Sequence, residues 1–520
     1  MLAALLLLPA PRPQACTNVL VTKGASKTGS TMISYSADSH QLYGELYYKP
    51  AAKYAPGTMM DVREWDSGRY LGQIAQVART YSTVGNMNEY QLAIGETTYG
   101  GREGLVDTTG LMDYGSLIYI ALQRAKTARE AIAVMTGLVE QYGYYSSGES
   151  FSIADPSEVW ILELIGKGTK MLNGQNANKG AVWVAVRIPD GYISAHANQA
   201  RITTFPLNDP QNCLYSKDVI SFAREMGFYK GADKDFSFSD TYAPLTFSAM
   251  RGCEARVWSV FNKVTPGMDK YIDYAMGHNP GNRMPLWVKP QEKLSVGDVM
   301  NFMRDHYEDT PMDMRNDIGA GGHNNPYRWR PMQWEVDGKE YVNERAIATQ
   351  QTGFWFVTES RGWLPDMIGG LNWFGVDDAG TSCLTPIYSS ANRVPLCFKE
   401  GNGDMLTYSP TSAFWLFNRV TNFAYMRYGM ISADILKVVK GFTDECLTEI
   451  PAVDAAAKIL YDKDPELARN FLTNYSVQRA DRLFETWDAL DKYLLVKYMD
   501  GNVKLEGPEG FLYNDLGGKT

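Results

Sequence analysis

Short runs of hydrophobic and β-branched residues predict strands in the first part of the chain. The runs are residues 17–22, 30–36, 151–154, 159–165, 181–188 and 192–195. A polar segment, 23–29, separates the first two runs, and an Asp-Pro-Ser turn signal separates the next two. The pattern therefore predicts two hairpins. The first of them begins at Cys16 and places that residue at the edge of a sheet.

The hydrophobic period becomes helical between these β-rich regions. Thr127 followed by Glu130 predicts a capped helix start, apolar residues recur at helical spacing as far as Val139, and Gly143 marks the end. Residues 115–125 predict another helix immediately before it. Beyond about residue 400 the pattern is helical again, over 412–428, 452–461 and, with breaks, 465–498. Helices alternating with groups of strands favour an α+β layered fold.

Composition and charge narrow the classes of function. The 520 residues are 45% hydrophobic and 21% charged, which is ordinary for a globular protein. A net charge of -9 without a basic stripe argues against a nucleic-acid partner. Beyond the N-terminus no apolar run approaches the ~18 residues that a membrane-spanning helix needs. No internal repeat or flexible linker marks a domain boundary.

The first residues are similar to a secretory signal. Residues 1–8 are almost wholly apolar, and a Pro- and Ala-rich segment ends at Ala15, just before Cys16. A basic n-region is missing, and Pro13 occupies a position where a small residue is preferred. We expect residues 1–15 to be removed from the mature protein. We also expect export to the periplasm, cell surface or medium, with a cytoplasmic location less favoured.

Several kinds of catalytic site have no signature in the chain. The five histidines form neither an H-E-x-x-H motif nor a paired zinc spacing, so no metal site is expected. No Walker loop, dinucleotide-binding motif or G-x-S-x-G elbow is present, and no cofactor is expected. The six cysteines lie far apart without a C-x-x-C pair, which leaves one or two disulfides open.

Cys16 is the main candidate for a nucleophile. A thiol has a pKa near ~8.5 and an α-amine one near ~7.7–8.0, so an N-terminal cysteine carries a nucleophile and its own base. Such a residue needs no histidine partner. Two alternatives remain from the residues alone: Cys16 could be the lipidated cysteine of a surface lipoprotein, or an inert buried thiol.

Motifs along the chain resemble one family. They are Cys16-Thr17-Asn18, Asn86-Met87-Asn88-Glu89, Gly95-Glu96-Thr97-Thr98, Trp160-Ile161-Leu162-Glu163, His196-Ala197-Asn198-Gln199-Ala200-Arg201-Ile202, Asn343-Glu344-Arg345-Ala346-Ile347 and Trp373-Phe374-Gly375-Val376-Asp377-Asp378. In this order they resemble the cysteine dipeptidases of the N-terminal-nucleophile (Ntn) hydrolase superfamily. That family includes broad-specificity dipeptidase A and is related to secernins, and more distantly to penicillin V acylase and bile salt hydrolase.

The resemblance implies a fold and a domain plan. The fold is an α+β Ntn-hydrolase αββα sandwich, with two antiparallel sheets between helical layers. Residues 1–15 would be the leader, 16–400 the catalytic domain, and 401–520 a helical C-terminal portion packed on the same domain.

The resemblance also implies roles for particular residues. The catalytic candidates are Cys16, Asp38, Asn88, Asn198 and Arg256, and the supporting candidates are Arg251, Arg201 and Glu89. Asn88 and Asn198 match oxyanion donors, Asp38 matches the aspartate that orients the nucleophile, and Arg256 is preferred over Arg251. His196 lies in the most distinctive motif, but we expect it to be structural.

The activity that the resemblance implies is hydrolysis of free dipeptides or small peptides through a thioester on Cys16. One alternative keeps the fold and changes the substrate to an N-acyl amide, as in penicillin V acylase or bile salt hydrolase. A second alternative is a Cys16-lipidated lipoprotein that binds peptide or glycan. The side-chain preference and a homo-oligomeric state stay open.

Overall fold

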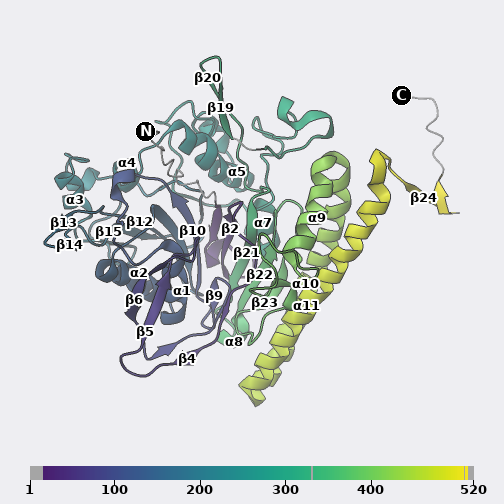
Figure 1. Ribbon diagram of the computed structural model, residues 1–520, viewed down its shortest axis with the longest axis horizontal. Helices are drawn as coiled ribbons and strands as arrows, with labels where there is room; N and C mark the ends of the chain where they lie inside the picture. Colours follow the sequence, from purple (N-terminus) through teal and green to yellow (C-terminus); the bar gives the residue numbers. More distant parts are fainter. Residues whose placement is uncertain (1–15, 330–331, 509, 513–520) are drawn as a thin grey trace, which may run out of the picture.

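The computed structural model describes residues 16–329, 332–508 and 510–512. The leader expected at residues 1–15 therefore lies outside the described residues. Two large antiparallel sheets form the centre of the molecule, and long helices lie along one side (Figure 1). The mixed α+β class predicted from the sequence is confirmed.

The first sheet has seven strands and carries the start of the described chain. In spatial order they are β18 (Trp287–Val288), β16 (Ile193–His196), β1 (Asn18–Val21), β2 (Thr31–Asp38), β21 (Thr352–Ser360), β22 (Gly370–Val376) and β23 (Thr385–Tyr388). The pairing of Leu20 with Ile33 closes the first predicted hairpin. Strand β1 also pairs with β16 on its other side. The prediction that Cys16 lies at a sheet edge is therefore wrong, because β1 is an internal strand.

The second sheet has eight strands. In spatial order they are β17 (Cys213–Tyr215), β15 (Ala181–Arg187), β12 (Val159–Gly166), β11 (Gly148–Ala154), β10 (Ala93–Tyr99), β9 (Met87–Asn88), β8 (Thr83–Val84) and β3 (Tyr48–Lys49). Strands β11 and β12 form the second predicted hairpin. Strands β15 and β16, which the sequence placed in one β-rich region, belong to different sheets because the Pro189-Asp190-Gly191 segment between them crosses from one sheet to the other.

Helices cover the outer faces of both sheets. On the second sheet lie α1 (Tyr114–Arg124) and α2 (Ala128–Tyr142). Against the first sheet pack α5 (Ala255–Val264), α7 (Val296–Phe302), α9 (Ala413–Met426), α10 (Tyr428–Lys463) and α11 (Pro465–Tyr498). Because the central strands are covered on both faces, β2 and β12 are buried at every position, including their polar residues.

Smaller elements complete the described chain. The short helices are α3 (Val219–Glu225), α4 (Phe238–Tyr242), α6 (Ile272–Ala275) and α8 (Asp366–Gly369). Five two-stranded ribbons are formed by β4 (Ala52–Lys53) with β7 (Arg79–Thr80), β5 (Met59–Arg63) with β6 (Tyr70–Ala75), β13 (Met171–Leu172) with β14 (Gln175–Asn176), β19 (Gln333–Val336) with β20 (Lys339–Val342), and β24 (Leu505–Gly507) with β25 (Gly510–Leu512).

The predicted helix ends are close to the observed ones. The Thr127 side chain accepts from the Glu130 backbone N–H, and Gly143 ends α2 with a φ of 79°. The Glu130 carboxylate accepts from the Lys126 backbone N–H at 2.7 Å, whereas a capping box would use the backbone N–H of Thr127. The C-terminal helices differ more: α10 spans 36 residues with Pro451 inside it, and α11 is continuous. The predicted breaks in α11 are wrong.

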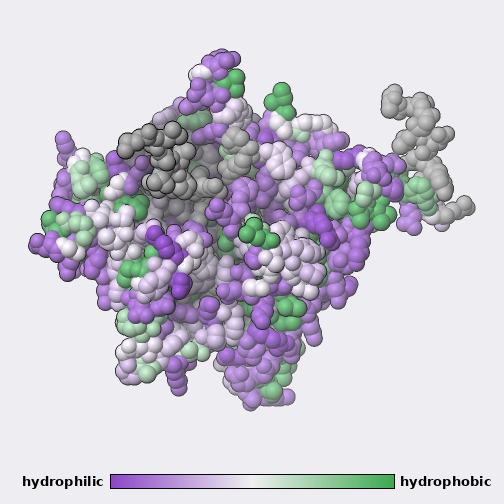
Figure 2. Space-filling model, viewed as in Figure 1, coloured by the Kyte–Doolittle hydropathy of each residue, from purple (hydrophilic) through white to green (hydrophobic). Residues whose placement is uncertain are grey.

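Hydrophobic side chains form two cores. One lies between the two sheets and extends under the C-terminal helices, and the other lies between the second sheet and α1 and α2. The face drawn in Figure 2 is mainly polar, with hydrophobic residues scattered in small groups. Within the described residues, no helix combines the length and apolarity that a membrane crossing requires.

Candidate active site

Cys16 lies two residues before β1, at the point where the two sheets face each other. Thr17 forms a bridge with Ser36 of β2, and Asn18 pairs with His196 of β16, so the backbone here is fixed on both sides. The Cys16 side chain is only 2% exposed. Its Sγ lies 3.5 Å from Glu96 Oε1 on β10 and 3.9 Å from Tyr35 Oη on β2. The thiol therefore occupies a polar site between the sheets.

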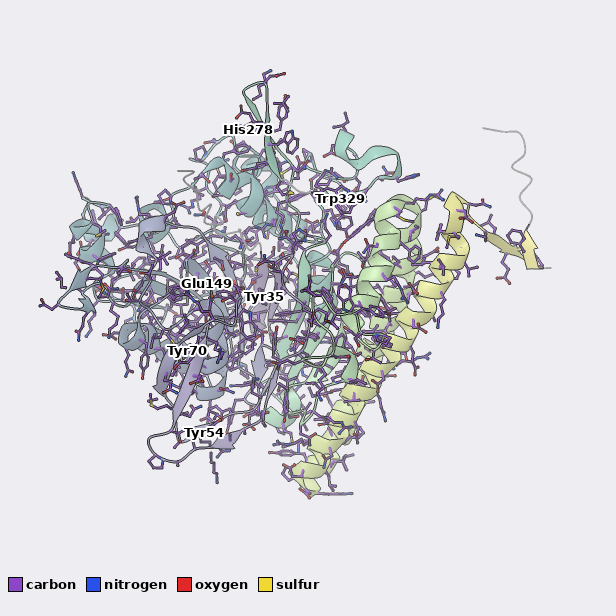
Figure 3. All side chains as sticks on the ribbon, in the orientation of Figure 1. Tyr35, Tyr54, Tyr70, Glu149, His278 and Trp329 are labelled. Atoms are coloured by element: carbon purple, nitrogen blue, oxygen red, sulfur yellow. The ribbon has the colours of Figure 1, made fainter. Side chains whose placement is uncertain are left out.

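The Tyr35 hydroxyl fixes the carboxyl group that faces the thiol. It donates a short hydrogen bond to Glu96, and its ring makes edge contacts with Phe354 and Phe356 at centroid distances of 5.8 and 5.6 Å. Burial raises the pKa of Tyr35 well above its usual value, so the hydroxyl stays protonated. Figure 3 shows Tyr35 near the centre of the molecule.

Arg256 joins the nucleophile strand to a loop of the neighbouring strand. It lies in the first turn of α5, which a π-helical turn, Ala249–Glu254, precedes. Its guanidinium donates to the Cys16 carbonyl oxygen at 2.6 Å and to Asn198 Oδ1 at 2.9 Å. Three further bonds of this guanidinium go to Thr17 Oγ1, Ala197 O and Gly252 O. Because this buried guanidinium is fully bonded, it fixes the positions of the groups that accept its hydrogen bonds.

Asn198 follows β16 in a left-handed backbone conformation, with a φ of 63°. Its side-chain amide donates to the Thr98 carbonyl oxygen on β10 at 2.7 Å and accepts from Arg256. A left-handed asparagine is a strained feature that often accompanies function. Arg256 thus places the Asn198 amide in the group around Cys16.

Asp38 ends β2, as the sequence predicted, on the Cys16 side of the sheet. Arg345 donates to its Oδ2 at 2.5 Å, and the Thr352 hydroxyl donates to its Oδ1 at 2.7 Å. Burial raises the pKa of Asp38, while the charge of Arg345 and these hydrogen bonds oppose that rise. A cleft adjoins this ion pair, and its lining includes Met314, Arg328 and Glu344 together with Arg345.

The electrostatic surroundings keep the Cys16 thiol protonated in this chain. Burial raises its pKa well above the usual value, and the charges of Glu96 and Asp38 raise it further. A hydrogen bond from the Asp38 backbone acts in the opposite direction. A second acid, Glu149 on β11, adds to the rise and is labelled in Figure 3. With a residue peptide-bonded before it, Cys16 is therefore a poor nucleophile at neutral pH.

The structure does not connect Asn88 to this group. Its side-chain amide donates to the Leu122 and Ala125 carbonyl oxygens at 2.8 Å, and its Oδ1 accepts from the Tyr90 and Leu92 backbone N–H groups. All these partners belong to the turn after β9 and the end of α1. The contacts make Asn88 a tie between the sheet and the helix, and they give no support to its predicted role as an oxyanion donor.

This placement predicts a stability effect for Asn88→Ala. The variant leaves two carbonyl oxygens and two N–H groups in the interior without their hydrogen-bond partner. We therefore expect the free energy of unfolding to fall by about 2–4 kcal/mol. The kcat of the folded fraction should stay close to that of the wild type. Denaturant unfolding and steady-state kinetics check both values. A loss of about 10²-fold in kcat at unchanged stability would restore the oxyanion role.

Each of the supporting candidates has a bonding partner of its own. Arg251 donates to Glu344 at 2.6 Å, next to the cleft described above. Arg201 forms a buried ion pair with Glu254 at 2.9 Å, and Glu89 accepts from the Ser82 backbone N–H. Within the described residues, the hydrogen bonds and ion pairs of these three side chains do not include Cys16, so their roles stay predictions.

His196 has the structural surroundings that the sequence analysis expected. Its Nδ1 lies 2.7 Å from Thr97 Oγ1 and its Nε2 lies 2.7 Å from Ser152 Oγ. Burial, together with the charge of Arg201, lowers its pKa to about 3, so the ring is neutral. A neutral imidazole with both nitrogens engaged links the two sheets.

Four residues of the site were missed as candidates: Tyr35, Glu96, Glu149 and Arg345. Glu96 and Arg345 fall inside motifs that carried the family resemblance, but neither was given a role. No clear signal existed for the two glutamates, since Glu96 is followed by two threonines and Glu149 lies between Gly148 and Ser150. Tyr35 carried no signal either, because tyrosine is common in strands.

In the part of the chain that the structure describes, no group of three or more His, Cys, Asp or Glu side chains could hold a metal ion. The six cysteines all fall in this part of the chain and all are free thiols. The disulfides left open by the sequence are therefore not formed in the structure.

Comparisons with known proteins agree with the resemblance. Residues 45–441 match the profile of Peptidase family C69. A "Probable dipeptidase" of Salmonella dublin is 26% identical over 396 residues, 72% of this chain and 81% of that protein. A "Probable dipeptidase" of Latilactobacillus sakei is 24% identical over 461 residues, 85% of this chain and 88% of that protein. A "Probable dipeptidase A" of Streptococcus pyogenes serotype M3 is 24% identical over 413 residues, with 73% and 77% covered.

The matches define a class of enzymes that cleave peptide bonds. Since the profile covers more than half of the sequence, the chain belongs to Peptidase family C69. The matched segment includes Asn198, Arg256 and Arg345 and begins after Cys16. Cys16 lies outside the matched segment, so its candidacy rests on its geometry.

Proposed function

We propose that this protein is an Ntn-type cysteine dipeptidase with the αββα sandwich of that superfamily. The observation that carries the proposal is the position of Cys16. It lies at the start of a central strand, its carbonyl oxygen is held by Arg256, and Asn198 and Asp38 lie around it. The names of the relatives supply the substrate class, which is a free dipeptide.

Activation is proposed to consist of cleavage of the peptide bond before Cys16. The cleavage creates an α-amine on the same residue as the thiol. When protonated, this amine places a positive charge beside the sulfur and lowers the thiol pKa, against the rise caused by burial, Glu96 and Asp38. When neutral, it can accept the thiol proton.

The acyl-transfer step follows from these groups. The Cys16 sulfur attacks the scissile carbonyl carbon while its proton passes to the α-amine. The tetrahedral intermediate then collapses, the C–N bond breaks, and the α-ammonium returns the proton to the leaving amine. A thioester remains on Cys16, and water, deprotonated by the same amine, hydrolyses it to a free acid and restores the thiol.

The proposed roles of the surrounding residues follow their contacts. Asn198, held by Arg256, is the donor proposed for the developing oxyanion. Arg256 fixes the Cys16 backbone, and Asp38 and Arg345 form a rigid ion pair beside it. Each of these groups is oriented by the fold before substrate arrives, which is what lowers a reaction barrier.

The alternative of a lipid-anchored cysteine fits these contacts poorly. The Cys16 sulfur faces Glu96 and Tyr35 in the interior, and the backbone continues at once into β1. A diacylglyceryl group on that sulfur would have to fill this polar site. Export remains part of the proposal, with residues 1–15 as the leader.

The raised thiol pKa predicts how Cys16 reacts with iodoacetamide before and after maturation. In a chain that retains residues before Cys16, labelling should be slow at pH 7 and should increase only above the usual thiol range near ~8.5. In a chain that begins at Cys16, labelling at pH 7 should be faster. Peptide mass spectrometry that quantifies Cys16 alone checks this, and equal pH profiles for the two forms would contradict it.

A substrate panel tests the proposed activity. The mature protein should hydrolyse free dipeptides and should be much slower on N-acyl amino acids. Hydrolysis of N-acyl amides without dipeptide cleavage would favour the acylase alternative. The absence of both activities from a correctly matured protein would contradict the hydrolase proposal.

A further inference from the structure

A pair of buried acids lies beside the candidate nucleophile. Glu96 on β10 and Glu149 on β11 are both fully buried. Glu149 pairs with Thr98, which lies two residues after Glu96 on the same strand, so the two acids are diagonal neighbours in the sheet. Both carboxyl groups act electrostatically on the Cys16 thiol, and Glu96 touches it at 3.5 Å. The pair forms one wall of the site.

Each acid lacks a donor at one oxygen. No N–H or O–H group of another described residue reaches Glu96 Oε2 or Glu149 Oε1. The two carboxyl groups act on each other electrostatically, and burial raises the pKa of both, further for Glu149. The other Glu149 oxygen, Oε2, accepts from the Thr98 hydroxyl at 2.9 Å.

Such a pair is costly if it is only structural. Burying a carboxyl group without full hydrogen bonding is unfavourable, and two adjacent acids repel each other when both ionise. A cationic ligand removes both costs. An ammonium group supplies a positive charge and three N–H donors, which are what the two orphan oxygens lack.

The size of a dipeptide places an ammonium group at this position. In a free dipeptide the α-ammonium nitrogen is separated from the scissile carbonyl carbon only by one α-carbon. A carbonyl carbon ready for attack lies about 3–3.5 Å from the sulfur. The ammonium must then lie within a few bond lengths of Cys16, and Glu96 Oε1 is already at 3.5 Å from that sulfur.

We propose that Glu96 and Glu149 bind the free α-ammonium group of the substrate and thereby restrict cleavage to peptides whose first residue carries an unblocked N-terminus. This inference rests on the proposed dipeptidase function and adds residues that determine its specificity. Tyr35 is the positioning residue for Glu96, through its short hydrogen bond.

The charges around Cys16 agree with this orientation of the substrate. The acids lie on the side of the second sheet, whereas Arg256 and Arg345 lie with Asp38 at the end of the first sheet. Arg256 and Arg345 are close enough for each to act on the other electrostatically. A dipeptide has one terminal charge of each sign, and its ammonium end is directed to the acids.

Glu149→Gln provides the test, since Glu149 does not touch the Cys16 sulfur. The substrates are an alanyl dipeptide and its propionyl analogue, which differ only in the α-ammonium group. We expect wild-type kcat/KM to favour the alanyl substrate at least about 100-fold, and the variant to lose about 10- to 100-fold on that substrate, mainly through KM. Because Glu149 also acts on the Cys16 thiol, a change in thiol reactivity affects both substrates alike, whereas loss of the ammonium site lowers activity on the alanyl substrate alone, so the ratio narrows.

Glu359→Gln is the matched control, because Glu359 is a buried glutamate on β21 that bonds Trp373 away from Cys16. It should keep the wild-type ratio. An unchanged ratio in Glu149→Gln, or equal losses on both substrates, would overturn the inference. If Glu149→Gln does not fold, the wild-type ratio still decides, since equal hydrolysis of both substrates would also overturn it. A wild type without dipeptide activity would instead refute the proposed function.

Discussion

Replacing Cys16 by serine is expected to lower kcat for dipeptide hydrolysis by at least about 10³-fold. The reason is chemical. A serine hydroxyl is far less acidic than a thiol, so the α-amine deprotonates it poorly, while the shape of the side chain is nearly kept. Steady-state kinetics on the mature variant measures the loss, and thermal unfolding confirms that the fold is retained.

Cys253→Ser is the matched control for that experiment. Cys253 is a free thiol in the turn before α5, where the charge of Arg256 acts on it, and its sulfur is not bonded to Cys16. Its variant should keep activity close to that of the wild type. A Cys16→Ser protein with more than a tenth of wild-type activity, or a Cys253→Ser protein without activity, would contradict the assignment of the nucleophile.

The second large effect is expected for Arg256→Lys. A lysine keeps the charge but cannot make the five bonds that the guanidinium makes to Cys16, Thr17, Ala197, Asn198 and Gly252. Both the backbone of the nucleophile and the proposed oxyanion donor lose their support. We expect kcat to fall about 10²-fold and the free energy of unfolding to fall by about 2–4 kcal/mol.

Arg251→Lys separates this role from a general effect of charge. Arg251 lies one turn earlier and is bonded to Glu344, which a lysine can still reach as an ion pair. Its kcat should change less than about tenfold. A larger loss for Arg251→Lys than for Arg256→Lys would reverse the choice between the two arginines that the sequence analysis made.

The parts of the fold that depend on local sequence were predictable. Both hairpins and α2 are specified by neighbouring residues, such as the turn at Asp155 and the cap at Thr127. The assignment of β15 and β16 to different sheets was not, because it depends on which distant strands pair. The continuity of α10 through Pro451 was also missed, because its contacts with α9 and α11 outweigh the lost hydrogen bond.

The residues of the candidate site also divide into those that local sequence could place and those that only long-range packing brings together. Asp38 could be placed beside Cys16 because a single hairpin connects them. Glu96 and Glu149 belong to the second sheet, and only the packing of one sheet on the other brings them to the thiol. For Asn88 the motif matched the family, but the structure did not connect the residue to the site. Its side chain bonds only to a neighbouring turn and to the end of α1.

The central claim is that one residue supplies both the attacking sulfur and the amine that carries its proton. The mass of the N-terminal peptide of active protein tests it most directly, after brief incubation with a dipeptide and acid quenching. The claim predicts a chain that begins at Cys16 with an unmodified α-amine, and a fraction with the sulfur acylated by the first residue of the dipeptide. Fully active protein in which another residue still precedes Cys16, or in which Cys16 carries a lipid, would contradict it.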